Sequence, residues 1–109
     1  MSALHGVVLV PATAKAGTAT VTVRLLDVSL QDVAAAEIAR VVLPGIAVQP
    51  GRRIPFVLEG ERGRGFVVQA EVSFGAVRSS GDLLTVSPVL ADTLSDSAEH
   101  PGAVPVVVI

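Results

Sequence analysis

Oxygen-bearing side chains are closely spaced in residues 27–32, and they are the first candidates for chemistry. Asp27, Ser29 and Asp32 could together ligate a hard cation, because Ca²⁺ takes several oxygen ligands from one short loop. A calcium loop usually carries more acids and a central glycine, and this segment has neither. Asp and Ser side chains at this spacing also accept backbone N–H groups where a strand ends. We therefore interpret the three residues as a structural turn, and predict no bound metal and no cofactor.

Hydrolytic chemistry would need a histidine beside a nucleophile and an orienting acid. The chain has two histidines, His5 and His100, and both lie near its ends. The candidate nucleophiles and acids are Ser79, Ser80, Ser95, Asp82 and Asp96. None of these serines has the glycine spacing of a nucleophile elbow. The pattern predicts that the chain holds no catalytic triad and is not an enzyme.

Glycoside hydrolysis would use two carboxylates that flank a sugar, and Glu59 and Glu71 are the candidates. Both fall on predicted outward faces. We therefore expect both carboxylates to lie on the solvated surface.

Four arginines form the densest basic cluster in the chain. Arg52, Arg53, Arg62 and Arg64 are half of the eight basic residues and lie within thirteen positions. Such a cluster could bind an anion or an acidic partner, because guanidinium groups pair well with carboxylates and phosphates. The alternative is a solvated rim. The glycines near Arg62 and Arg64 do not form a phosphate loop, because the Lys and the following Ser or Thr of that motif are missing.

The composition narrows the class of protein. A chain of 109 residues predicts one domain, residues 1–109. It has no cysteine, which excludes disulfides, thiolate metal sites and a lipid-attachment cysteine. A net charge of −2, with three Phe and no Tyr or Trp, argues against nucleic-acid binding. No segment approaches the roughly 20 apolar residues that a membrane-spanning helix needs.

Alternation of apolar and polar residues predicts strands as the main elements. In residues 19–27, Val21, Val23 and Leu25 share one face, which indicates a half-buried antiparallel strand. Residues 66–74 show the same period, with Phe66, Val68, Ala70, Val72 and Phe74 predicted to point inward. Residues 54–58 also alternate, and Pro55 on the outward face predicts an edge strand or a bulge. Further strands are predicted at residues 7–10, 83–86 and 104–109, with a hairpin turn at 79–82 and a loop at 91–102.

Residues 30–43 allow two interpretations. Apolar residues lie at helical spacing, and Ser29 to Asp32 resembles a capping box. Residues 37–43 also fit a strand that Pro44-Gly45 would end. We favour a turn or a single helical turn at 29–35, followed by a strand over 37–43. The whole pattern predicts an all-β antiparallel sandwich of about seven strands, immunoglobulin-like, with no long helix.

Several blocks of the sequence resemble the YbaY-like family of bacterial envelope lipoproteins, which includes the YscW-type pilotins. The blocks are Asp27-Val-Ser-Leu-Gln-Asp32, Ile38-Ala39, Ile54-Pro-Phe-Val-Leu58, Phe66-Val-Val-Gln-Ala-Glu-Val72, Gly81-Asp-Leu-Leu84 and Pro88-Val89. The resemblance covers roughly residues 5 to 109. It implies a pilotin-like β-sandwich without catalysis, and a role in binding a secretin subunit and helping its assembly in the envelope.

We therefore expect a protein that works by binding, as an interaction or assembly module. The apolar segments Val7–Val10 and Val106–Ile109 could offer unpaired backbone groups to a partner or a second copy, if either lies at a sheet edge. The alternatives are a self-associating structural module and a small hydrolase or carbohydrate-active protein. If Met1 is the native start, we expect a cytoplasmic protein. If a signal segment was removed, we expect one of the cell envelope, like the relatives.

Overall fold

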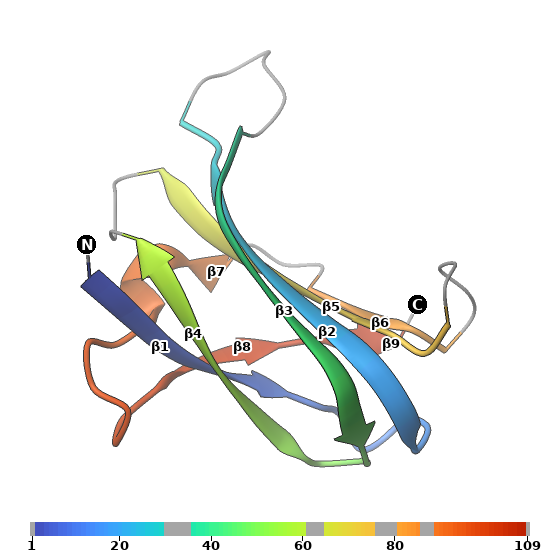
Figure 1. The fold of residues 1–109 in the computed structure, drawn as a ribbon. Coiled ribbons are helices and arrows are strands. Elements are labelled where there is room, and N and C mark those ends of the chain that lie inside the picture. The colour runs from blue at the N-terminus through green and yellow to red at the C-terminus, as the bar shows by residue number, and fades with distance from the viewer. Residues whose placement is uncertain (1, 30–35, 61–64, 76–80, 86–88, 109) are drawn as a thin grey trace.

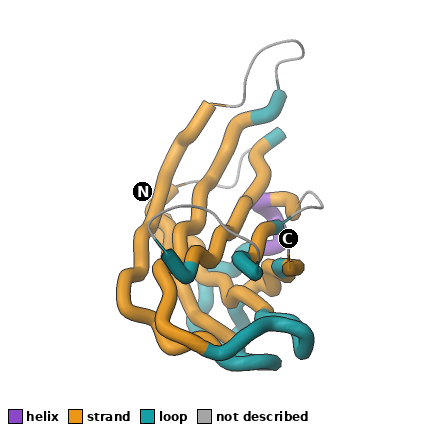
Figure 2. The backbone as a smooth tube through the Cα atoms, turned by 90° about the vertical axis from the view of Figure 1, so that its right-hand side faces the viewer, coloured by secondary structure: helices purple, strands orange, loops and turns teal. Residues whose placement is uncertain are grey.

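A computed structural model of the chain describes residues 2–29, 36–60, 65–75, 81–85 and 89–108. In these ranges the chain forms nine strands and one 3-10 helix (Figures 1 and 2). In chain order they are β1 (Ser2–Leu9), β2 (Gly17–Asp27), β3 (Ala36–Val48), β4 (Arg53–Gly60), β5 (Phe66–Ser73), β6 (Leu83–Leu84), β7 (Val89–Leu90), η1 (Ala91–Thr93), β8 (Gly102–Pro105) and β9 (Val107–Val108). The described residues contain no long helix, as predicted.

The strands form two sheets that pack face to face around one core. The small sheet has the order β4-β1-β8, and the large sheet has the order β3-β2-β5-β6-β9, with β7 also paired to β5. All the pairings are antiparallel except that of β1 with β8, which is parallel. The predicted all-β sandwich is confirmed, and the parallel pair is an addition to it.

The core is built by alternation, because successive side chains of a strand point to opposite faces of the sheet. The residues of β2 predicted to share a face, Val21, Val23 and Leu25, are fully buried. The inner faces of the other long strands add Leu4, Val8, Ile54, Phe56, Leu58, Val68, Ala70 and Val72. Phe66, which begins β5, and Phe74, which follows its last residue, are only partly buried at the margin of this core.

Strand β3 is longer than the sequence predicts. We expected the strand to end at Leu43, before Pro44-Gly45, but it continues to Val48. The pairing of β3 with β2 shifts register there, and Gly45 adopts a φ of +66°. A β-bulge with a left-handed glycine absorbs one extra residue without ending the ladder. A second register shift, next to Ile38, divides β3 again. Residues 30–35, which include most of the predicted turn, lie outside the described residues.

The C-terminal segment is not the single strand we predicted over residues 104–109. It forms β8 in the small sheet and β9 in the large sheet, and the chain passes from one layer to the other at the buried Val106. The predicted loop at 91–102 also contains more structure than expected. It includes η1, and Ser95 pairs with His5 of β1 through two backbone hydrogen bonds of 2.6 and 3.0 Å.

Thr85 fills a break in the large sheet between β6 and β7. Its hydroxyl accepts a hydrogen bond from the Ala70 N–H at 3.1 Å and donates one to the Pro105 carbonyl at 3.2 Å. Its own N–H donates to the Ala70 carbonyl at 3.0 Å. The side chain thus replaces one rung of the ladder and ties β5 to the end of β8. The sequence pattern does not mark Thr85 as a buried residue.

Two glycines lie side by side at the centre of the small sheet, where Gly6 of β1 pairs with Gly102 of β8. A Cβ added to Gly6 would lie 2.4 Å from Cζ of Phe56 and 2.8 Å from Cδ2 of Leu94. A Cβ added to Gly102 would lie 1.9 Å from the backbone oxygen of Thr93. The space above the two glycines is therefore already filled, by the Phe56 ring and by the segment that follows η1.

Candidate functional site

The main candidate site is a groove between β3 and β4, the edge strands of the two sheets. The two strands meet at the corner formed by residues 49–52 and diverge from it on one side of the sandwich (Figure 1). Between them lies a cavity of about 400 Å³. Its lining residues are Ala39, Arg40, Val41, Val57 and Glu59.

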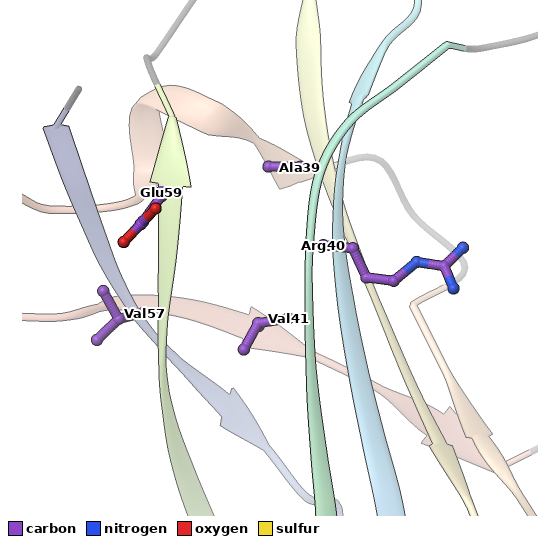
Figure 3. A pocket seen from close by; sticks show the side chains of 5 residues that line it. All are labelled: Ala39, Arg40, Val41, Val57 and Glu59. Atoms are coloured by element: carbon purple, nitrogen blue, oxygen red, sulfur yellow. The ribbon is translucent and has the colours of Figure 1, made fainter.

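The groove is walled by short apolar side chains and by backbone. Figure 3 shows Ala39 and Val41 pointing from β3 toward the space beside β4, and Arg40 pointing to the opposite side of β3. Val57 and Glu59 point away from β3, so the side of β4 that borders the groove is mainly main chain. The described lining therefore contains no group of titratable side chains that converge on one point.

The hydrogen-bond pattern of the large sheet indicates which N–H and C=O groups of β3 point to its open edge. The N–H and C=O of Ala70 both bond to Thr85, so they point away from β2. Because bonded and non-bonded pairs alternate in antiparallel ladders, Val23, which is paired with Ala70, must point its groups toward Val41 of β3. Val42, the next residue, then points its N–H and C=O away from β2, toward the open edge. The regular segment 39–43, between the two bulges, is the part of β3 that can pair with another chain.

Pro55 protects the edge of β4. This strand pairs with β1 on one side, and its other side is an edge of the small sheet. Proline has no N–H to donate and its ring obstructs an added strand, so it is tolerated at edges and blocks pairing there. The prediction that Pro55 marks an edge strand is confirmed. Of the two strands that border the groove, β3 therefore has the less obstructed edge over residues 39–43.

A row of charges crosses the outer face of the large sheet beside the groove. Arg24 of β2 and Arg40 of β3 are direct cross-strand neighbours, which would be repulsive without a counter-charge. Glu37 supplies it, with Oε1 at 2.8 Å from Nη2 of Arg40 and 3.5 Å from Nε of Arg24. Glu71 of β5 lies 3.9 Å from Arg24 on the other side. These ion pairs make the outer face of the large sheet polar.

The predicted turn at the end of β2 is formed by Asp27 and Ser29. Oδ1 of Asp27 accepts hydrogen bonds from the Ser29 hydroxyl at 2.6 Å and from the Ser29 N–H at 2.9 Å. Gly65, with a φ of +81°, packs so closely on this turn that an added Cβ would lie 2.7 Å from Cβ of Ser29. Asp32 lies outside the described residues. In the described part of the chain, no group of three or more His, Cys, Asp or Glu residues could hold a metal ion.

The same two hydrogen bonds give stability a dependence on pH. The Ser29 hydroxyl, and then its N–H, hold the pKa of Asp27 below its ordinary value of 3.8. A depressed pKa in the folded state means stabilisation that is complete above the unfolded pKa and lost as the pH falls through the folded pKa. We therefore expect Asp27→Asn to be less stable than wild type near neutral pH, with a difference that shrinks below pH 3.8. Urea unfolding midpoints of both proteins across the acid range test this, and a gap that stays constant would contradict it.

The structure describes two of the four clustered arginines, Arg52 and Arg53. Arg52 donates from Nη1 to the Ala47 carbonyl and so closes the corner between β3 and β4. Arg53 is exposed at the start of β4. Arg62 and Arg64 lie outside the described residues, and the glycines that flank them, Gly60 and Gly65, lie at or beyond the far end of β4. The described residues therefore do not place the four arginines in one patch.

The residues considered for catalysis are distributed over the fold. His5 is tied to Ser95 by backbone bonds, and His100 is exposed, with its N–H 3.4 Å from the Ser97 carbonyl. Asp82 is fully buried and accepts the Phe74 N–H at 3.1 Å. Ser79 and Ser80 lie outside the described residues. Glu59 and Glu71 belong to the outer faces of different sheets, so they do not flank one site.

Comparison of the chain with protein-family models, with curated proteins and with solved structures gives no match. In the described residues, no helix is long and apolar enough to cross a membrane. The groove was missed in the sequence because its two walls come from different sheets. The one signal that pointed toward it was Pro55, which marked β4 as an edge.

Proposed function

We propose that this protein is a non-catalytic protein-binding module that adds an extended segment of a partner to the free edge of β3. The observation that carries the proposal is the regular segment 39–43, which has open backbone groups and lies beside an apolar groove of about 400 Å³. Main-chain hydrogen bonds would supply affinity, and pockets for alternate side chains would supply specificity. The partner's inward side chains would meet Ala39 and Val41.

The partner is expected to be apolar, and it need not be charged. Arg40 is already held by Glu37 through two hydrogen bonds of 2.8 and 3.0 Å. Val42 is 48% exposed on the same outer face of β3. Side chains of an added strand would therefore pack beside Val42 on the outer face of the sheet and beside Val41 on the inner face. The resemblance to YbaY-like and YscW-type domains, which rests on the residue pattern, supports an assembly role of this kind and an envelope location.

A proline at position 42 is the sharpest test of strand addition. Val42 directs its N–H away from β2, so Val42→Pro should leave the β2–β3 ladder intact while placing a ring on the open edge. We expect a display library of random nine-residue peptides to yield alternating apolar sequences that bind the wild type. Their affinity should fall at least about tenfold for Val42→Pro, the order of loss expected when hot-spot contacts are removed.

Val42→Thr is the matched control, because threonine keeps the N–H and the β-branched shape. It should bind the selected peptides within about threefold of the wild type, as a rim substitution does. Thermal unfolding followed by circular dichroism checks that both variants remain folded. Peptides that bind Val42→Pro as tightly as the wild type, or a library with no enrichment, would contradict the proposal.

A further inference from the structure

The outer face of the small sheet is apolar, unlike the outer face of the large sheet. Val7 lies between the inward-facing Gly6 and Val8, so its side chain points outward, and yet it is only 3% exposed. Its neighbours in register are Pro55 on β4 and Ala103 on β8. The small-sheet face consists of Leu9, Pro55, Val57, Ala103 and Pro105, with His5 and Ala3 at one end, and Val7 is buried among them. The large sheet carries the Arg24, Glu37 and Glu71 row in the corresponding place.

Two charged residues lie at opposite ends of this face, both on β4. Arg53 begins the strand and Glu59 lies near its end, and both are exposed. Neither takes part in an ion pair with another described residue. The outward row of β4 thus has the order positive, apolar, apolar, negative. Such a row is complementary to itself when it is reversed.

We infer that this face binds a second copy of the same chain, with the two small sheets packed face to face and β4 antiparallel to its counterpart. A two-fold axis that lies between the two sheets and runs along the row of Gly6 and Phe56, which are paired in register, places Arg53 of each copy opposite Glu59 of the other. The same axis places Pro55 opposite Val57, so that apolar surface meets apolar surface. Pairing edge to edge through β4 is not available, because the Pro55 ring occupies that edge.

The size of the face sets the strength of this dimer. Two strands of eight residues and one of four cover about 300 Å² per copy, at about 3.3 Å per residue and about 4.8 Å between strands. A stable complex buries roughly 800 Å² per partner. The dimer is therefore weak, and it forms at micromolar to millimolar protein concentration. Charge pairing at both ends selects the antiparallel orientation and makes association weaker as salt rises.

Charge reversal tests the arrangement directly, by sedimentation velocity over that concentration range. We expect Arg53→Glu and Glu59→Arg each to weaken self-association by about tenfold or more, because two attractive pairs become two repulsive ones. An equimolar mixture of the two variants should form a heterodimer, since one variant then has two acidic ends and the other has two basic ends. The double variant exchanges the two charges and should self-associate as the wild type does.

Glu99→Arg is the control for net charge, because Glu99 is exposed and lies outside the face. It should leave association unchanged, and so should Val42→Pro, since this dimer does not use the β3 edge. Wild-type protein that is monomeric throughout the range would overturn the inference. Single variants that associate like the wild type, or a mixture that stays monomeric, would also overturn it.

Discussion

Gly102→Ala is expected to lower the free energy of unfolding by about 3 kcal/mol or more, the upper range for overpacking a core. The added Cβ would lie 1.9 Å from the backbone oxygen of Thr93 and 2.9 Å from Cα of Leu94. A flexible side chain could rotate away from such a contact, but this neighbour is main chain. Relief requires either β8 to move away from β1 or the 93–94 segment to lift off the sheet. Either movement exposes Leu94, which is 1% exposed in the fold.

The measurement is chemical denaturation of Gly102→Ala, with Gly17→Ala as the matched control. Gly17 begins β2, is exposed, and its added Cβ would lie 3.3 Å from the Phe74 ring, a side chain that can shift. Because alanine has fewer unfolded conformations than glycine, the control should lie within about 1 kcal/mol of the wild type. Equal stability of the two variants would show that the Thr93 and Leu94 backbone does not pack against Gly102 as described.

Thr85→Val is expected to cost about 2 to 4 kcal/mol, although valine has nearly the same shape as threonine. The buried Ala70 N–H loses its partner, which costs about 1–3 kcal/mol, and the part-buried Pro105 carbonyl loses a hydrogen bond worth about 1 kcal/mol. The substitution removes the hydroxyl that accepts the Ala70 N–H and donates to the Pro105 carbonyl. The Ala70 N–H remains in the core, where water cannot easily replace that hydroxyl, and Thr85 itself is only 7% exposed.

Thr85→Ser is the control that separates the hydroxyl from the methyl group. It keeps both hydrogen bonds and loses one methyl, so it should cost about 1 kcal/mol. Denaturant unfolding orders the three proteins, and amide hydrogen exchange at Ala70 reports the bond itself. We expect faster exchange at Ala70 in Thr85→Val than in Thr85→Ser. A valine variant as stable as the serine variant would contradict the assigned role.

The strands that alternate strictly were predictable from the sequence. In β2, β4 and β5 the apolar residues recur at every second position, and burial follows the same period in the structure. Pro55 identified an edge because proline removes a donor wherever it occurs. These predictions succeeded because each depends on a local rule of strand geometry.

Other features could not be predicted because they depend on contacts between distant segments. Pro44-Gly45 signals the end of a strand, but pairing with β2 near its start carries β3 past it. Val106 looks like the middle of one strand, yet the chain changes sheets there. The groove requires β3 and β4 to lie at one side of the sandwich, and no spacing along the sequence encodes that.

The candidate site residues show where spacing along the sequence predicts contact. Asp27 and Ser29 were chosen from their spacing, and the structure joins them by hydrogen bonds, because an Asx turn forms within three residues. The arginines were grouped by proximity in sequence, and the extended strand β4 separates Arg52 from Gly65. Sequence proximity therefore predicts contact within a turn, and the grouping of the four arginines stays a prediction.

The parallel pairing of β1 with β8 constrains the order in which the protein can be completed. β1 is synthesised long before β8, so one edge of β1 stays uncovered until the strands between them have been made. Such distant pairings slow folding, and an open apolar edge invites aggregation meanwhile. A chain that ends before Gly102 would leave the β8-facing edge of Val7 to Leu9 unpaired. A growing chain passes through the same state, so we expect it to depend on prompt release or on a chaperone.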